Sequence, residues 1–107
     1  MNKPKILTKE EIESGLKNLP GWAYVEDPST SLGTGKISKE YKFKDFLNAF
    51  NFISTLVSYF EEMDHHPDMH IYYNRVVFEL QRFDIGGKVT DRDLTVAEEI
   101  EKHYSSL

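Results

Sequence analysis

The stretch from Phe43 to Met63 constrains the fold most, because it is the longest periodic segment and carries two apolar stripes. One stripe has the three- and four-residue spacing of a single helix face: Phe43, Phe46, Leu47, Phe50, Ile53, Val57 and Phe60. A second stripe lies beside it: Ala49, Phe52, Leu56, Tyr59 and Met63. A helix that covers one face of a small sheet needs only one stripe. We therefore predict that the first stripe faces the core. The second would be buried against another copy of the chain, in a homodimer or homotetramer, or else against a shorter helix of the same chain.

Shorter patterned segments on either side predict the remaining elements. Thr8 and Glu11 form a capping box that begins a first helix, and Pro20 ends it. Strands are expected over residues 22–26, 36–42, 69–73 and 75–83, and a last helix begins at Thr90. In the fourth strand one face is apolar and the other mostly polar, which is typical of an antiparallel sheet covered on one side only. The order α-β-β-α-β-β-α therefore predicts one α+β domain over residues 1–107.

The charge balance and the missing cysteines exclude several classes of function. The 107 residues include 13 basic and 18 acidic ones, a formal net charge of −5, without a cluster of lysine and arginine. Direct binding of nucleic acid is not expected, because phosphate recognition requires concentrated positive charge. No apolar run approaches the roughly 20 residues of a membrane span, so we expect a cytoplasmic protein that binds no membrane. The absence of cysteine excludes a disulfide framework, a thiolate zinc site and a thiol nucleophile.

The segment Asp64-His65-His66-Pro67 holds the best candidates for chemistry. Two adjacent imidazoles titrate near neutral pH without special tuning, and the proline after them disfavours continuation of the helix. We expect both histidines at the end of the long helix. Glu61 and His65 would share one face of it, because they are four residues apart.

Three interpretations of the histidines stay open from the residues alone. In the first, His65 and His66 only occupy the last helical turn, where a charged imidazole interacts favourably with the helix dipole. In the second, they bind a metal together with Glu61 and His70, although Pro67 interrupts the geometry and no other ligand motif follows. In the third, they act as general acid and base without a metal, in a pocket between the helix end and the sheet.

Residues near the start of the last helix also admit two interpretations. Thr90-x-x-Asp93 resembles a capping box with aspartate in the usual place of glutamate or glutamine, so capping alone would explain Asp93. Arg92 beside it would then be a solvated surface charge. In the other interpretation both residues lie near the histidines, which sequence spacing does not establish. Met69 is expected to pack, although a sulfur side chain also suits a pocket for a flat heteroaromatic ligand.

Six segments follow one another over nearly the whole chain: Leu7-Thr8-Lys9-Glu10-Glu11-Ile12, Leu19-Pro20-Gly21-Trp22, Phe43-Lys44-Asp45-Phe46, Asp64-His65-His66-Pro67-Asp68, Tyr73-Asn74-Arg75-Val76 and Thr90-Asp91-Arg92-Asp93-Leu94. In these segments the chain resembles the pterin-4a-carbinolamine dehydratases. The most specific part is His-His-Pro with an acidic residue four positions before the first histidine. The resemblance implies a four-stranded antiparallel sheet with helices packed on one face.

The resemblance also implies a lyase. The family removes water from 4a-hydroxytetrahydrobiopterin, the product of pterin-dependent aromatic amino-acid hydroxylases, and gives quinonoid dihydrobiopterin in tetrahydrobiopterin recycling. By position, His65 and His66 would be the catalytic acid–base residues. The residues implied to support them or to lie at the pterin are Glu61, Asp64, Pro67, Met69, Phe83, Arg92 and Asp93. No metal and no organic cofactor is implied.

Phe83 is the main departure from the family pattern. The pattern places a third histidine, sometimes tryptophan, ten residues after the aromatic residue that corresponds to Tyr73, and phenylalanine cannot transfer a proton. If the missing histidine is a principal acid or base of the family reaction, we expect its absence to lower the rate on the order of 10²–10⁴-fold. Two alternatives accompany the dehydratase: a weakly active or non-catalytic pterin-binding relative, and a protein-interaction or dimerisation module that uses the surface of the long helix.

Overall fold

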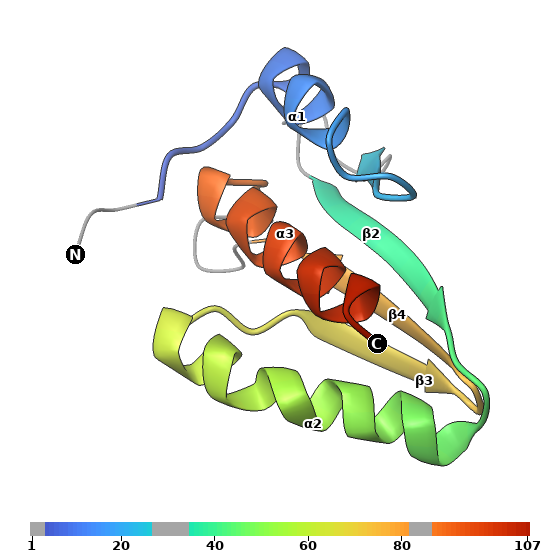
Figure 1. The fold of residues 1–107 in the computed structure, drawn as a ribbon. Helices are drawn as coiled ribbons and strands as arrows, with labels where there is room; N and C mark the ends of the chain where they lie inside the picture. Colours follow the sequence, from blue (N-terminus) through green and yellow to red (C-terminus); the bar gives the residue numbers. More distant parts are fainter. Residues whose placement is uncertain (1–3, 27–34, 82–86) are drawn as a thin grey trace.

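A four-stranded antiparallel sheet with the spatial order β1-β2-β4-β3 underlies three helices. The computed structural model describes residues 4–26, 35–81 and 87–107. Its elements are α1 (Lys9–Leu16), β1 (Ala23–Glu26), β2 (Gly35–Lys42), α2 (Phe46–Met63), β3 (Asp68–Tyr72), β4 (Arg75–Leu80) and α3 (Asp91–Ser105). Figure 1 shows α2 and α3 side by side across one face of the sheet, with α1 beside its β1–β2 end. The predicted α+β class and the order α-β-β-α-β-β-α are confirmed.

The two central strands have one buried and one outer face. Ile37 and Tyr41 of β2 are at most 1% exposed, and every second residue of β4 from Val76 to Leu80 is fully buried. The register places Ile37 opposite Leu80 and Tyr41 opposite Val76, so that these apolar side chains stand on the same face. The residues between them are half-buried or exposed. The sheet is therefore covered on one side, as its alternation predicts.

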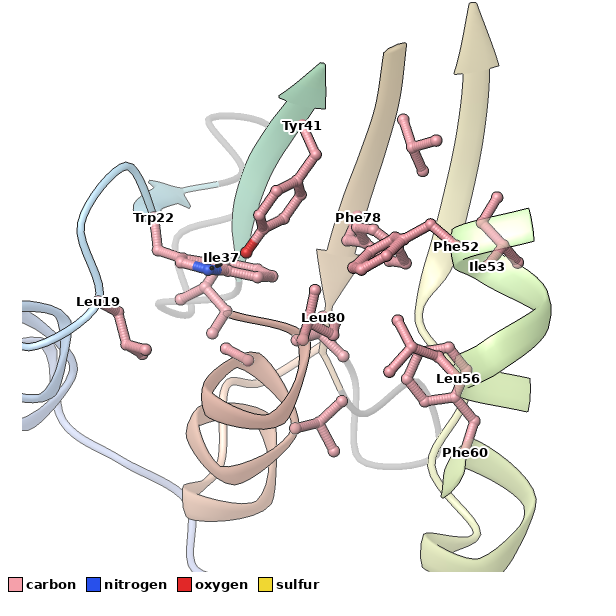
Figure 2. Packing of buried hydrophobic residues seen from close by; sticks show 14 of the residues in the cluster. Leu19, Trp22, Ile37, Tyr41, Phe52, Ile53, Leu56, Phe60, Phe78 and Leu80 are labelled. Atoms are coloured by element: carbon pink, nitrogen blue, oxygen red, sulfur yellow. Dashed lines mark hydrogen bonds between the residues drawn. The ribbon is translucent and has the colours of Figure 1, made fainter. Parts of the chain in front are cut away.

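The core fills the layer between the sheet and the helices. Figure 2 shows Phe52, Leu56 and Phe60 of α2 pointing toward the side where Phe78 stands on β4. At the other end of the core, the Tyr41 hydroxyl accepts a hydrogen bond from Trp22 Nε1 at 3.1 Å.

The same Tyr41 hydroxyl ties β2 to α3. It donates to Oε1 of Glu101 at 2.6 Å, and the Glu101 carboxylate also bonds Lys39 Nζ. Burial, and after it the hydrogen bond to Glu101, raises the pKa of Tyr41 above its ordinary value. The hydroxyl therefore stays protonated and keeps its role as donor to α3.

The helix α2 begins at Phe46, three residues later than predicted. Asp45 is its N-cap, and its Oδ1 accepts a hydrogen bond from the backbone N–H of Asn48 at 2.9 Å. Aspartate is among the preferred N-cap residues, so the helix starts directly after Asp45. The apolar spacing, which continues to Phe43, does not reveal this start. Phe43 instead packs as a half-buried residue against the core.

The prediction of which α2 stripe faces the core is wrong. The buried residues of the helix are Ala49, Phe52, Ile53, Leu56 and Phe60, which come mostly from the stripe predicted to be surplus. Four residues of the stripe predicted to be buried are about half exposed or more: Phe46 at 49%, Leu47 at 65%, Phe50 at 50% and Val57 at 48%. Helical spacing reports that two apolar faces exist but not which one meets the sheet. The helix does have a second apolar face that the core does not cover, and it is the face that carries Phe46, Phe50 and Val57.

All four strands differ from their predicted bounds by one to three residues: β1 begins one residue later than predicted, and β2 and β3 each begin one residue earlier. β4 ends at Leu80, so Gln81 already lies beyond the strand, and the last two residues of the predicted range, 82 and 83, lie outside the described part of the chain. β3 ends at Tyr72, and the next residue, Tyr73, has a φ of 55° in the turn to β4. Among the residues described, no helix is both long and apolar enough to cross a bilayer.

Candidate active site

Asp64 ends α2 and turns the chain before the two histidines. Its φ of 49° and ψ of 46° are left-handed, a conformation that aspartate tolerates better than most residues other than glycine. The N–H of His65 donates to the carbonyl of Phe60 at 3.1 Å, and the N–H of Asp64 donates to that of Glu61 at 3.1 Å. The helix ends at Met63, as predicted, and the histidines lie at its exit; the one interpretation that places them inside the last helical turn is not what the structure shows.

His65 points into the protein. Its side chain is 4% exposed, and its Nε2 forms a hydrogen bond with Oδ1 of Asp93, whose side chain is fully buried. The two residues are 28 positions apart in the sequence. Figure 1 shows how the fold joins them, since the end of α2 and the start of α3 lie at the same end of the sheet.

Asp93 is also held from its own helix. Its second oxygen, Oδ2, accepts hydrogen bonds from the backbone N–H of Thr90 at 2.7 Å and from the Thr90 hydroxyl at 3.1 Å. Thr90 is fully buried as well. The two interpretations of Asp93 are thus compatible, because one oxygen of the carboxylate caps α3 while the other meets His65.

His66 points the other way, into solvent. Its side chain is 56% exposed, and its Nε2 lies 2.5 Å from Oε2 of Glu61, which is 70% exposed. The expectation that Glu61 shares a helix face with His65 is wrong, because the turn at Asp64 carries His65 away from α2 and leaves His66 beside Glu61. Adjacent histidines therefore have separate carboxylate partners in opposite environments.

Other candidate residues border this corner. Arg92 of α3 donates from Nη1 to the carbonyl of Met63 at 3.4 Å, which links the start of α3 to the end of α2. Pro67 is buried directly after the histidines, and Asp64 is exposed. Met69, 38% exposed, lies opposite Phe78 in the β3–β4 register and so on the helix-facing side of the sheet. Phe83 lies outside the described residues.

His70 stands apart from this group. It lies opposite Val77 on the outer face of the sheet, and its Nε2 is 3.1 Å from Oε1 of Glu79. Burial by itself would raise the pKa of Glu79, but hydrogen bonds from Lys36 and His70 outweigh burial and lower it. Of the four suggested metal ligands only Glu61 and His66 are paired with each other, whereas His65 and His70 bond Asp93 and Glu79. In residues 4–26, 35–81 and 87–107, no three histidine, aspartate or glutamate side chains gather as a metal site would require.

A hollow of about 550 Å³ lies elsewhere, between α1 and β1. It is wide open to solvent and is lined by Lys9, Glu13, Leu16, Lys17, Tyr24 and Glu26. Its lining mixes both charges and contains no histidine, so it offers no pair of groups for proton transfer near neutral pH. The histidine corner remains the better site for chemistry.

The two histidine–carboxylate pairs can divide the work of proton transfer. A carboxylate only accepts hydrogen bonds, so each Nε2 can donate to its partner, which leaves each Nδ1 for a ligand. One buried ring that accepts a proton and one exposed ring that donates it would suit the elimination of water from a small molecule. The hydrogen bonds of Thr90 to Asp93 belong to this arrangement, and the capping-box spacing was the only sequence signal for them.

The family model described as pterin 4 alpha carbinolamine dehydratase matches residues 5–103 of the chain. A curated relative from Sulfolobus acidocaldarius, named "Putative pterin-4-alpha-carbinolamine dehydratase", is 38% identical over 96 residues, which cover 90% of this chain and 96% of the relative. A crystal structure of a transcriptional coactivator/pterin dehydratase from Brucella melitensis is 34% identical with a TM-score of 0.79. That likeness covers 92% of this chain and 98% of the other.

A more distant solved structure is similar in fold alone. It is that of a pterin dehydratase-like protein identified as a RuBisCO assembly factor in the alpha-carboxysome. It is 17% identical, with a TM-score of 0.59 over 78% of this chain and 88% of that one.

Proposed function

The chain belongs to the pterin 4 alpha carbinolamine dehydratase family, and we propose that it is a hydro-lyase that dehydrates 4a-hydroxytetrahydrobiopterin to quinonoid dihydrobiopterin. The observation that carries the proposal is the pair of adjacent histidines with different partners, His65 on the buried Asp93 and His66 on the exposed Glu61. Elimination of water needs one group that takes a proton and one that gives it, and imidazole does both near neutral pH.

The two environments suggest a division of roles. We assign to His65 the proton from N5 of the pterin, because its Nε2–H is directed to Asp93 and its Nδ1 keeps a lone pair. His66, when charged, gives a proton to the 4a-hydroxyl oxygen while Glu61 holds its other nitrogen. The bond between C4a and oxygen breaks, water leaves, and the electron pair of the former N5–H bond forms the double bond between N5 and C4a.

The test compares matched histidine variants in stopped-flow dehydration of freshly made 4a-hydroxytetrahydrobiopterin. His65→Gln and His66→Gln should each lower the catalysed rate on the order of 10²–10⁴-fold. His70→Gln, on the outer face of the sheet, makes the same chemical change away from the site and should leave the rate within about twofold of wild type. Equal effects of all three variants would refute the assignment. If wild type binds pterin but the reaction runs no faster than without protein, the chain is instead a non-catalytic pterin-binding member of the family.

The exposed face of α2 favours a second function, association with another copy of the chain. Phe46, Phe50, Ile53 and Val57 follow one another at intervals of four, three and four residues, the spacing of a seam between two paired helices. Ile53 is 8% exposed, and the other three are about half exposed. A surface of this kind pairs with its own copy about a two-fold axis, which gives a homodimer or, with a second contact, a homotetramer.

Light scattering after size exclusion tests this association. Phe50→Glu should shift the wild-type oligomer to monomer, because it places a charge in the apolar seam. The control Asn51→Glu adds the same charge at the next, polar, exposed position and should keep the wild-type mass. A wild type that is already monomeric at micromolar concentration would contradict self-association. It would leave α2 as a surface for another protein, a role consistent with the coactivator in the name of the Brucella melitensis structure.

A further inference from the structure

Residues 5–7 lie beside the segment that leads into α3. Ile6 forms an antiparallel bridge with Thr90, and two backbone hydrogen bonds of 3.0 Å flank this bridge, one on each side. The N–H of Lys5 also donates to Oδ1 of Asp91 at 2.8 Å. The backbone of Thr90 is therefore fixed before α3 begins, by a part of the chain more than 80 residues away.

Thr90 in turn fixes the orientation of the Asp93 carboxylate. Two of its donors, the backbone N–H and the hydroxyl, bind the same oxygen, Oδ2, at 2.7 and 3.1 Å. Both residues are fully buried, so water does not compete for these bonds. With Oδ2 occupied, the remaining oxygen, Oδ1, is directed to His65 Nε2.

We propose that Thr90 is a positioning residue that, through Asp93, holds His65 in the tautomer with its hydrogen on Nε2 and so leaves Nδ1 as the proton-accepting atom. A carboxylate oxygen accepts and does not donate, so Nε2 of a neutral His65 must carry the hydrogen. If the Asp93 carboxylate were free to rotate, it would accept from His65 Nε2 less often, and the tautomer with its hydrogen on Nδ1 would become more populated. The inference rests on the proposed function, because it names the atom by which His65 takes the proton.

The Thr90 hydroxyl also takes part in the capping box of α3, so a loss of stability alone would not identify a positioning role. The hydroxyl is in addition a second donor to Asp93 Oδ2, beside the backbone N–H of Thr90, and this bond bears on the orientation of the carboxylate. Partners that orient metal-bound histidines change affinity or activity by about ten- to a hundredfold when removed, and we expect an effect of the same size for a group that orients His65. The hydroxyl can be removed with little change in volume by Thr90→Val, whereas Thr90→Ser keeps it.

The test reads the tautomer of His65 directly from long-range proton–nitrogen correlation spectra of the imidazoles. The signal that His65→Gln removes identifies the ring among the four histidines of the chain. Wild type and Thr90→Ser should show the hydrogen on Nε2, and Thr90→Val should show a mixture of tautomers. In the dehydration assay, Thr90→Val should lower kcat by about ten- to a hundredfold with KM unchanged, and Thr90→Ser should restore kcat.

Asp93→Asn supplies a second variant, because Thr90→Val could fail to fold. If the donors of Thr90 hold the amide oxygen, then the amide N–H of the new side chain faces His65, and the hydrogen of the ring must move to Nδ1. A pure Nε2–H signal in a folded Thr90→Val, or in Asp93→Asn, would overturn the inference. Because this readout needs no turnover, an inactive wild type with the expected tautomers would refute the proposed function and leave the positioning role standing.

Discussion

Removal of the Asp93 carboxylate should destabilise the protein far more than removal of an exposed aspartate from the same helix. In Asp93→Ala, three buried donors lose their acceptor: the Nε2–H of His65 and the backbone N–H and hydroxyl of Thr90. A buried donor left without a partner costs about 1–3 kcal/mol, and the lower end applies where the structure relaxes around the gap. We expect a loss of about 3–5 kcal/mol in the free energy of unfolding, the range for breaking a buried pair.

Urea unfolding followed by the fluorescence of Trp22, the one tryptophan of the chain and a buried residue, measures this loss. At about 4 °C per kcal/mol for a domain of this size, the melting temperature should fall by about 12–20 °C. Asp91→Ala is the control, because Asp91 is exposed in the first turn of α3 and should cost about 1 kcal/mol or less. An Asp93→Ala loss no larger than that of the control would refute the view that the three donors depend on this carboxylate.

Three further predictions concern a helix cap, a buried hydrogen bond and the turn before the histidines. The backbone N–H of Asn48, and then its side chain, hold the pKa of Asp45 below its ordinary value of 3.8. Because the folded state has the lower pKa, wild type should melt above Asp45→Ala at neutral pH, and thermal scans should show this gap closing as the pH falls below that value. Tyr41→Phe leaves the buried indole N–H of Trp22 without its acceptor and should cost about 1–3 kcal/mol in urea unfolding. Asp64→Gly should keep or raise the melting temperature, whereas Asp64→Val should lose about 1–2 kcal/mol to left-handed strain.

The sequence was sufficient for the architecture because its local signals agree with one another. The capping box at Thr8 and Glu11 is present as predicted, with the Glu11 N–H donating to the Thr8 hydroxyl at 3.2 Å. The alternation through Val76, Phe78 and Leu80 appears as a buried face of β4. The periodicity after Asp45 gives a helix of 18 residues. Each of these features depends on residues that lie only a few positions apart in the sequence, which is the range over which sequence patterns are informative.

The errors arise where long-range geometry or a single backbone angle decides. Both stripes of α2 satisfy helical spacing, and only the position of the sheet determines that Leu56 is buried while Phe50 is exposed. The left-handed angles of Asp64 separate His65 from Glu61, although a periodic pattern extended through that position would keep them together. The contact of His65 with Asp93 depends on how two helix ends meet across 28 residues, so no spacing rule predicts it.

The turn at Asp64 also makes the neighbouring imidazoles chemically distinguishable. A reagent that acylates imidazole, such as diethyl pyrocarbonate, reaches a ring according to its solvent exposure, which is 56% for His66 and 4% for His65. Brief treatment should therefore label one member of the pair and spare the other. Of two identical side chains in adjacent residues, the reagent can thus block His66 while leaving His65 intact, without a mutation.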